Sequence, residues 1–169
     1  NSIIHLDTEK ARIELNKTSV AIENIPLLFE GSFEFGEHPN VTCKVEKTEL
    51  TFNEIVSLLP EEINAQFSPY EPEGTAIFDL SIQGPLEKIN VLTHIDIKDG
   101  SLKEINTGVQ LNNIQFSGIY TLNSGTDSIE IKTLQAQLGN GNINIHGSIY
   151  PNQNPEVHLN LQANSDLND

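Results

Sequence analysis

Cysteine, tryptophan, methionine and basic residues are scarce or missing in this chain of 169 residues. Cys43 is the one cysteine, and there is no tryptophan or methionine. A single thiol excludes an internal disulfide and a zinc or iron–sulfur site built from several cysteines. Nine Lys and Arg stand against 24 Asp and Glu, which gives a net charge of −15. This balance argues against a nucleic-acid partner, because binding to phosphates requires basic groups, and it disfavours adsorption to anionic lipid headgroups.

Long hydrophobic runs are also missing. Apolar residues make up 37 % of the chain, and no run approaches the roughly 18 residues needed to span a bilayer. No signal peptide is visible, and the chain starts inside sequence that looks structured, at Asn1-Ser-Ile-Ile-His-Leu. We therefore expect a piece of a longer protein, with any targeting signal outside it.

What the sequence has instead is a regular alternation of apolar and polar residues. Successive side chains of an extended chain point to opposite faces, so each alternating run predicts a strand with one apolar and one polar face. Such strands are typical of antiparallel sheets. Residues 74–83 and 128–138 each run for about ten residues, roughly 35 Å at ~3.4 Å per residue. The clearest sets that share one side of a run, apolar except for Thr93, are Ala76, Phe78, Leu80 and Ile82; Val91, Thr93, Ile95 and Ile97; Ile143 and Ile145; and Val157, Leu159 and Leu161.

Turn signals separate these runs. Asp99-Gly100 and Asn140-Gly141 predict hairpin turns, since Asn, Asp and Gly tolerate positive φ, and residues 124–127 predict a third. The apolar positions change parity between Ile131 and Leu134, which predicts a bulge or bend near Thr133. Long strands joined by tight turns predict a meander.

Glycines recur inside the predicted strands. The phrase apolar-x-apolar-x-Gly-x-apolar appears three times, with a looser fourth copy, around Gly84, Gly118, Gly147 and Gly31. Glycine inside a strand marks a bulge or a close approach of another backbone. Four of them in comparable places predict a sheet that bends repeatedly along one line.

Residues 51–67 depart from the alternation. Their apolar positions fall on one helical stripe, made of Ile55, Leu58, Leu59 and Ile63. Thr51 and Glu54 have the spacing of a capping box, with Asn53 as a rival cap, and Pro60 fits the first turn of a second helix. We expect two short helical turns on a sheet edge or end, followed by an irregular loop over residues 68–74, because Pro69 and Pro72 lack the amide donor.

The polar residues that could form a metal or catalytic site each have a simpler structural explanation. His94, His146 and His158 share the polar side of their strands and would suit zinc, but their spacing follows no ligand motif, so we expect no metal site. Glu61-Glu62 fits a helix start. Asp99 and Asp127 are expected in turns. No carboxylate pair is placed for glycoside hydrolysis.

No catalytic fingerprint stands out either. Cys43 shares a face with Val41 and Val45, as a small core residue would. Residues 139–142 are rich in glycine but lie at a predicted hairpin tip, and there is no Gly-x-Ser-x-Gly, Walker or dinucleotide motif. We expect no enzyme and no cofactor. The aromatic residues expected on strands would either pack in a core or contact a ligand: Phe29, Phe33, Phe35, Phe78, Phe116 and Tyr120.

The order of these features resembles the periplasmic portion of AsmA-family proteins. Leu58-Leu-Pro-Glu-Glu62 is followed by the strand from Gly74 to Gln83, by Gly84-Pro-Leu86, and by Val91 to Lys98 with Asp99-Gly100-Ser-Leu102. Then come Leu111-Asn-Asn-Ile114 and Pro155-Glu-Val-His-Leu-Asn-Leu161. The resemblance extends from about Glu49 to the C-terminus, and residues 1–48 fit only as further hairpins. We expect a single β-rich domain or a fragment of a larger AsmA-like region. It would consist of hairpins over 1–52, a helical insert over 53–67 and an AsmA-like β-meander over 73–163.

The resemblance implies a mainly β fold: a long, curved antiparallel sheet that forms a groove, related to bridge-like lipid-transfer proteins. It implies a periplasmic protein tethered to the inner membrane through an N-terminal helix missing from this piece, which moves phospholipid or maintains the outer membrane without catalysis. The resemblance implies phospholipid or acyl chains as ligands. Burying a lipid tail gains about 0.8 kcal/mol per methylene, so an apolar groove could bind such chains. The expected groove lining is Phe78, Leu80, Ile82, Val91, Ile95, Ile97, Ile143, Ile145, Leu159 and Leu161.

The sequence is also compatible with two other hypotheses about function. A secreted β-sandwich that binds polysaccharide, such as an adhesin, would show the same alternation, although the chain has no Trp and only three Tyr to serve as aromatic platforms. An enzyme is the third reading. Alternation alone does not distinguish a groove from the filled core of a sandwich.

Overall fold

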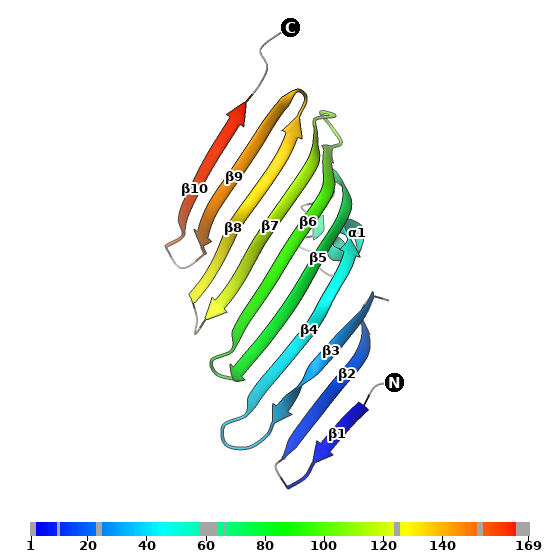
Figure 1. The fold of residues 1–169 in the computed structure, drawn as a ribbon, viewed down its shortest axis with the longest axis vertical. Coiled ribbons are helices and arrows are strands. Elements are labelled where there is room, and N and C mark those ends of the chain that lie inside the picture. Colours follow the sequence, from blue (N-terminus) through cyan, green and yellow to red (C-terminus); the bar gives the residue numbers. More distant parts are fainter. Residues whose placement is uncertain are drawn as a thin grey trace.

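The computed structural model describes residues 3–9, 11–22, 25–57, 64–65, 67–123, 126–151 and 154–164, which form one open antiparallel sheet of ten strands (Figure 1). Each strand pairs with the next one in the chain, so the sheet is a meander. The prediction of a mainly β meander is confirmed, and the sandwich is wrong for the described residues, because all their strands belong to one sheet. The elements are β1 (Ile3–Asp7), β2 (Arg12–Ile22), β3 (Ile25–Glu34), β4 (Asn40–Thr51), α1 (Phe52–Ser57), β5 (Tyr70–Pro85), β6 (Asn90–Glu104), β7 (Gln110–Asn123), β8 (Thr126–Leu138), β9 (Gly141–Tyr150) and β10 (Glu156–Asn164).

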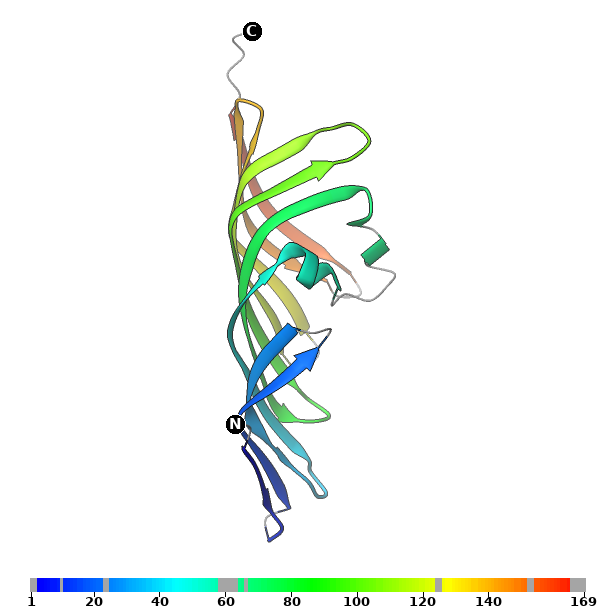
Figure 2. The same ribbon diagram turned by 90° about the vertical axis from the view of Figure 1, so that its right-hand side faces the viewer.

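The sheet is bowed along its strands, and α1 lies on its concave side (Figure 2). Register shifts interrupt most of the strand pairs, and bulges of this kind bend a strand and increase its twist. The bulge predicted near Thr133 is confirmed. Ser117 pairs with Thr133 while Gly118 pairs with Ile131, so Lys132 is left without a partner on β7.

The three predicted turns have different outcomes. Asp99-Gly100 does not form a hairpin: it lies inside β6, where Asp99 has φ +54° and the register shifts between Ile97 and Gly100. The tolerance of this dipeptide for positive φ serves a bulge there instead of a turn. The turn at Asn140-Gly141 is confirmed, although Leu138 pairs with Gly141, so the two loop residues are Gly139 and Asn140. Ser124 and Gly125 lie outside the described residues; Asn123 and Thr126 pair on either side of them.

The irregular loop predicted over residues 68–74 is wrong, because β5 already begins at Tyr70. β4 ends at Thr51 opposite Thr75, so the first residues of β5 are paired with β6 but not with β4 in the described part of the sheet. At Pro72 the missing amide donor therefore removes no bond to β4. Gly74, with φ +113°, forms the bulge that joins this extension to the rest of β5.

The helical insert is confirmed where the structure describes it. The Thr51 amide donates to Glu54 Oε2 at 2.7 Å, and the Glu54 amide donates to Thr51 Oγ1 at 3.3 Å. This is the predicted capping box, with Thr51 and not Asn53 as the cap. Asn64, Ala65 and Phe67 are helical. The predicted positions Leu58, Leu59, Pro60, Glu61, Glu62 and Ile63 lie outside the described residues.

The glycine prediction is confirmed in part. A Cβ added to Gly31 would lie 2.1 Å from the Thr42 carbonyl oxygen, and one added to Gly147 would lie 1.9 Å from the His158 carbonyl oxygen. Both glycines therefore allow a neighbouring backbone to approach closely. The predicted single line is wrong, however. Gly118 and Gly147 both pair with Ile131, whereas Gly31 and Gly84 pair elsewhere, with Cys43 and Val41.

The core lies where α1 covers the sheet. Ile25, Leu27, Val45 and Leu50, from β3 and β4, form a buried cluster. Partly buried Ile55 of α1 packs against this cluster, together with three residues of the sheet: Phe29, Phe78 and Leu80. The capping box holds the start of α1 next to Leu50, so local hydrogen bonding positions the cover of the core.

Candidate functional site

The register of the strands collects the apolar side chains on one face of the sheet. Directly paired residues of antiparallel strands project to the same face. One row of such pairs crosses seven strands, from β4 to β10, and is apolar throughout: Leu50, Ala76, Ile97, Phe116, Leu134, Ile145 and Leu161. We call this side of the sheet the apolar face and the opposite side the polar face.

All ten residues expected to line a groove belong to the apolar face. Phe78 pairs with Ile95, Ile82 with Val91, and Ile145 with both Leu134 and Leu161. Alternation and pairing place the others on the same side: Leu80, Ile97, Ile143 and Leu159. The structure thus brings residues that are more than 80 positions apart in sequence onto one surface.

The apolar face is the concave one. Ile55 of α1 packs against the buried cluster to which Val45 and Leu50 of the apolar face belong, and α1 lies on the inner side of the bowed sheet. A second layer is not formed by the residues that the structure describes, so away from α1 this inner face is open. The result is a trough-shaped sheet with an apolar inner surface.

Exposure of the apolar face increases with distance from α1. Val45 is 1 % exposed, the apolar side chains of β6 to β9 are mostly half-buried, and Leu161 on β10 is 64 % exposed. Phe78 and Leu80 pack against the buried cluster, so they belong to the core as much as to the lining. The strands furthest from α1 therefore offer the most accessible apolar surface.

One polar pair interrupts the apolar face near the β7–β8 turn. Tyr120 shares this face with Asp127, which pairs with Leu122 inside β8 and so does not lie in the turn where the sequence suggested it. Burial raises the pKa of the Tyr120 phenol, and its interaction and hydrogen bond with Asp127 raise the pKa further. A neutral phenol bonded to a carboxylate gives the trough a polar end.

The histidines lie on the polar face, as predicted, but they do not converge. His94 Nδ1 is 2.8 Å from Asp79 Oδ1 on the neighbouring strand. His146 on β9 and His158 on β10 lie three and four strands away from His94, opposite Asn160 and Ser148. The described residues contain no group of three or more His, Cys, Asp or Glu side chains able to hold a metal ion.

Cys43 lies on the apolar face between Gly31 and Ile82. Partial burial raises the pKa of its thiol. A thiol that stays protonated is a poor nucleophile, which agrees with a packing role.

The aromatic residues divide between core and trough. Phe29 and Phe78 pack against the buried cluster, whereas Phe116 and Tyr120 lie on the half-buried part of the apolar face. Phe33 also lies on that face, and its ring meets the Phe35 ring edge-on, with centroids 4.6 Å apart. Phe35 was expected on a strand but follows the end of β3 and is 49 % exposed.

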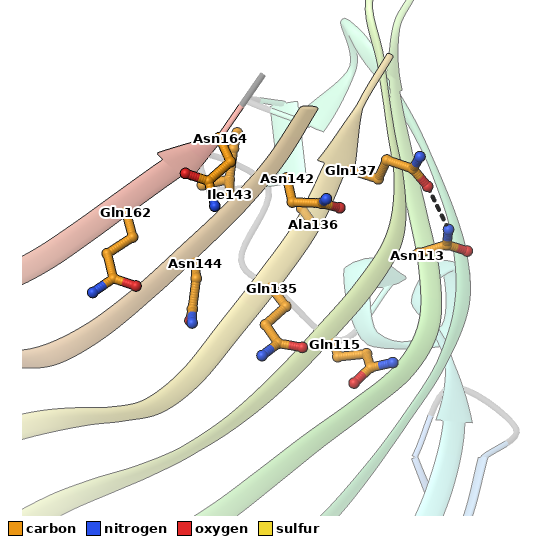
Figure 3. A pocket seen from close by; sticks show the side chains of 10 residues that line it. All are labelled: Asn113, Gln115, Gln135, Ala136, Gln137, Asn142, Ile143, Asn144, Gln162 and Asn164. Atoms are coloured by element: carbon orange, nitrogen blue, oxygen red, sulfur yellow. Dashed lines mark hydrogen bonds between the residues drawn. The ribbon is translucent and has the colours of Figure 1, made fainter. Parts of the chain in front are cut away.

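The sequence interpretation missed a set of side-chain amides on the polar face of β7 to β10. They line a hollow of about 360 Å³ (Figure 3). The signal was available, since the polar positions of residues 112–115, 135–144 and 160–164 are almost all Asn or Gln. Within a single strand these residues indicate no more than its polar side.

Comparison with models of known protein families, with curated proteins and with solved structures gives no match to this chain. The resemblance to AsmA-family proteins therefore stays a prediction. Among the described residues, no helix combines the length and the apolar character needed to cross a membrane.

Proposed function

We propose that this chain is a non-catalytic segment of an AsmA-like periplasmic protein that holds acyl chains of phospholipid in its concave apolar face. In this proposal the segment contributes to phospholipid transport or to maintenance of the outer membrane, in a longer protein tethered to the inner membrane. The observation that carries the proposal is the continuous apolar row from Leu50 to Leu161 on the inner side of a single-layer sheet.

Partial exposure supports a ligand and not only a core. Large apolar side chains such as Val157, Leu159 and Leu161 are 56 %, 44 % and 64 % exposed. Covering apolar surface gains about 25 cal/mol per Å², so an acyl chain laid along the trough would be bound by contact alone. Such binding needs no specific polar group on the floor of the trough.

The distribution of charge supports the same arrangement. The cross-strand ion pairs Arg12–Glu34, Lys44–Glu30 and Lys103–Glu71 join residues of the polar face. The outer side of the sheet is therefore suited to water, and the inner side to hydrocarbon. A surface with a net charge of −15 would keep the outer side away from anionic membranes.

Native mass spectrometry of the purified chain, combined with titration of a fluorescent fatty acid, tests the proposal. We expect co-purified phospholipid or fatty acid and saturable binding of the probe. Absence of both would contradict the proposal.

A matched pair of variants tests which face binds. Ile145→Gln changes the apolar face, and Ile119→Gln makes the same change on the polar face, where Ile119 lies between His94 and Glu130. Loss of one aliphatic contact should weaken binding roughly three- to tenfold for Ile145→Gln, with Ile119→Gln close to the parent chain. Equal weakening by the two variants would show that the concave face is not the site.

A further inference from the structure

Two rows of side-chain amides cross the polar face of the last four strands. The first row consists of Asn112, Gln137, Asn142 and Asn164, and the second of Gln115, Gln135, Asn144 and Gln162. Every position in both rows is a primary amide, although 20 % of the chain is charged. The rows come from β7, β8, β9 and β10, so the meander assembles them from separate parts of the sequence.

The rows border a defined hollow. Its volume is about 360 Å³, within the range of about 300–1,000 Å³ that small-molecule sites occupy. All the amides of the two rows except Asn112 line it, and Asn113 adds another. The side chains of Gln135 and Gln115 point toward each other at its floor, and Asn144 and Gln162 continue the line across the strands (Figure 3).

Most of these amides have unused hydrogen-bonding groups. Asn113 Nδ2 donates to Gln137 Oε1 at 2.8 Å, and this is the one side-chain hydrogen bond of the hollow among the described residues. Each of the other amides offers two N–H donors and one oxygen acceptor. Gln115, Gln135, Asn142, Gln162 and Asn164 are exposed, so a ligand could reach these groups without rearrangement of the strands.

The chemistry of the rows selects a class of ligand. The lining residues that the structure describes include no basic side chain to hold an anion, and the net charge of −15 repels one. None of the described residues that line the hollow is a carboxylate able to hold a cation. Hydroxyl groups both donate and accept, as amides do, so an uncharged ligand rich in hydroxyls can pair with both ends of each amide.

Strand spacing favours a linear ligand. Neighbouring strands are about 4.8 Å apart, which is close to the length of one pyranose unit in an extended glycan. Successive units of a chain lying across β7 to β10 would meet successive amides of one row. We propose that the amide rows form a binding site for a neutral, linear oligosaccharide on the polar face, separate from the apolar face.

Self-association is the main competing use of such rows, because Asn and Gln ladders also join identical sheets. That interface requires flat faces that lie against each other along their length. The amide rows lie on the outer side of a bowed sheet, opposite the face that α1 covers. Two convex faces touch over little area, and the hollow would remain unfilled, so the shape favours a small ligand.

Titration calorimetry and two-dimensional NMR with three defined probes test the site: a β-1,4-linked glucose hexamer, an α-1,4-linked glucose hexamer and a galacturonate hexamer. We expect one of the neutral hexamers to bind and the galacturonate hexamer to bind at least tenfold more weakly. The side-chain NH2 signals of Gln135 and Asn144 should shift on binding. No neutral binding at 10 mM ligand, or equal binding of the charged hexamer, would overturn the proposal.

Variants locate the site and separate it from the proposed lipid function. Gln135→Leu with Asn144→Leu should weaken neutral hexamer binding at least tenfold and leave fatty-acid binding unchanged. Gln83→Leu, an amide of the polar face on β5, is the matched control and should bind as the parent does. If the double variant disturbs the circular dichroism spectrum, Gln135→Ser provides the same comparison with a smaller change. Unchanged affinity in the folded variant, or an amide-dependent dimer in analytical ultracentrifugation with no glycan binding, would overturn the proposal.

Discussion

Two leucines at opposite ends of one row show how differently the two halves of this sheet are built. Leu50 on β4 and Leu161 on β10 belong to the same apolar row, yet Leu50 is 4 % exposed and Leu161 is 64 % exposed. Around Leu50, α1 and its neighbours cover the sheet, whereas β7 to β10 remain a single layer. Apolar and polar residues alternate in both regions. The presence of α1, and not the alternation, therefore decides which part of the sheet becomes a core.

The two regions should differ in what stabilises them. In β3 to β5, packing of side chains against α1 adds to the hydrogen bonds of the sheet. In β9 and β10, the backbone ladder carries more of the structure, because few apolar side chains there are buried. Changes of side chains should therefore destabilise the first region most, and changes of the backbone the second.

The largest difference is expected between Leu50→Ala and Leu161→Ala. Leu50→Ala should lower the free energy of unfolding by about 2–5 kcal/mol, because it leaves a cavity in the buried cluster. Leu161→Ala removes a side chain that is already largely in water, so its effect should be several-fold smaller. Urea denaturation followed by circular dichroism measures both. Similar losses for the two variants would mean that the two ends of the row are equally buried in solution.

Backbone dependence of the second region is tested by Gly147→Ala. The added Cβ would collide with the His158 carbonyl oxygen, and φ at Gly147 is +151°. We expect a loss of about 1–3 kcal/mol, typical of a strained backbone position, concentrated in the pairing of β9 with β10. Hydrogen exchange should accelerate in β10 and remain unchanged in β4.

Gly36→Ala is the matched control for that variant. Gly36 has φ +135°, but an added Cβ would have open space around it. Strain alone would make the two glycine variants alike, whereas a backbone collision would make Gly147→Ala the worse one. If the amides of β10 exchanged as slowly in Gly147→Ala as in the parent chain, this would contradict the close approach of β9 and β10.

The start of α1, the helix that covers the buried cluster, is tested at its capping box. Thr51→Ala removes the hydroxyl that accepts from the Glu54 amide, and should cost about 1 kcal/mol. Asn53→Ala changes the rival cap, which makes no capping bond in the described structure, and should cost nothing measurable. A loss with Asn53→Ala and none with Thr51→Ala would show that α1 begins at a different residue.

The smallest expected effect lies in the β6–β7 hairpin, between the two regions. Glu104 accepts hydrogen bonds from the side-chain hydroxyl and amide of Thr107 and from the Asn106 amide, which lowers its pKa from 4.5 to about 2. Because the pKa is lowered, these bonds stabilise the hairpin fully at pH values above the ordinary glutamate pKa of about 4.5. This contribution disappears as the pH falls from about 4.5 through 2. The Thr107 amide signal in NMR should titrate with a midpoint near 2. A midpoint near 4.5 would contradict the hydrogen-bonded hairpin.

The sequence was most informative where its signal is local. Alternation identified which residues share a side within each strand, including the ten expected to line a groove, and the spacing of Thr51 and Glu54 identified the cap of α1. The parity change at Thr133 located a bulge. Each of these depends on neighbouring residues along one strand or one helical turn.

Prediction was weaker where the partner strand decides the outcome. Asp99-Gly100 has the composition of a turn but forms a bulge, because β7 continues alongside β6 past that point. Pro72 is accommodated in β5 because β4 has already ended. The amide rows need residues from four strands, so they become apparent only when the register is known.

Binding of acyl chains to the concave apolar face, as proposed, can be measured at single residues with a nitroxide-labelled stearate and methyl NMR. Bound probe should broaden the methyl signals of Ile95, Ile145 and Leu159 on the apolar face, and spare those of Ile119 and Leu92 on the polar face. Equal broadening on the two faces, or none at saturating probe, would contradict it.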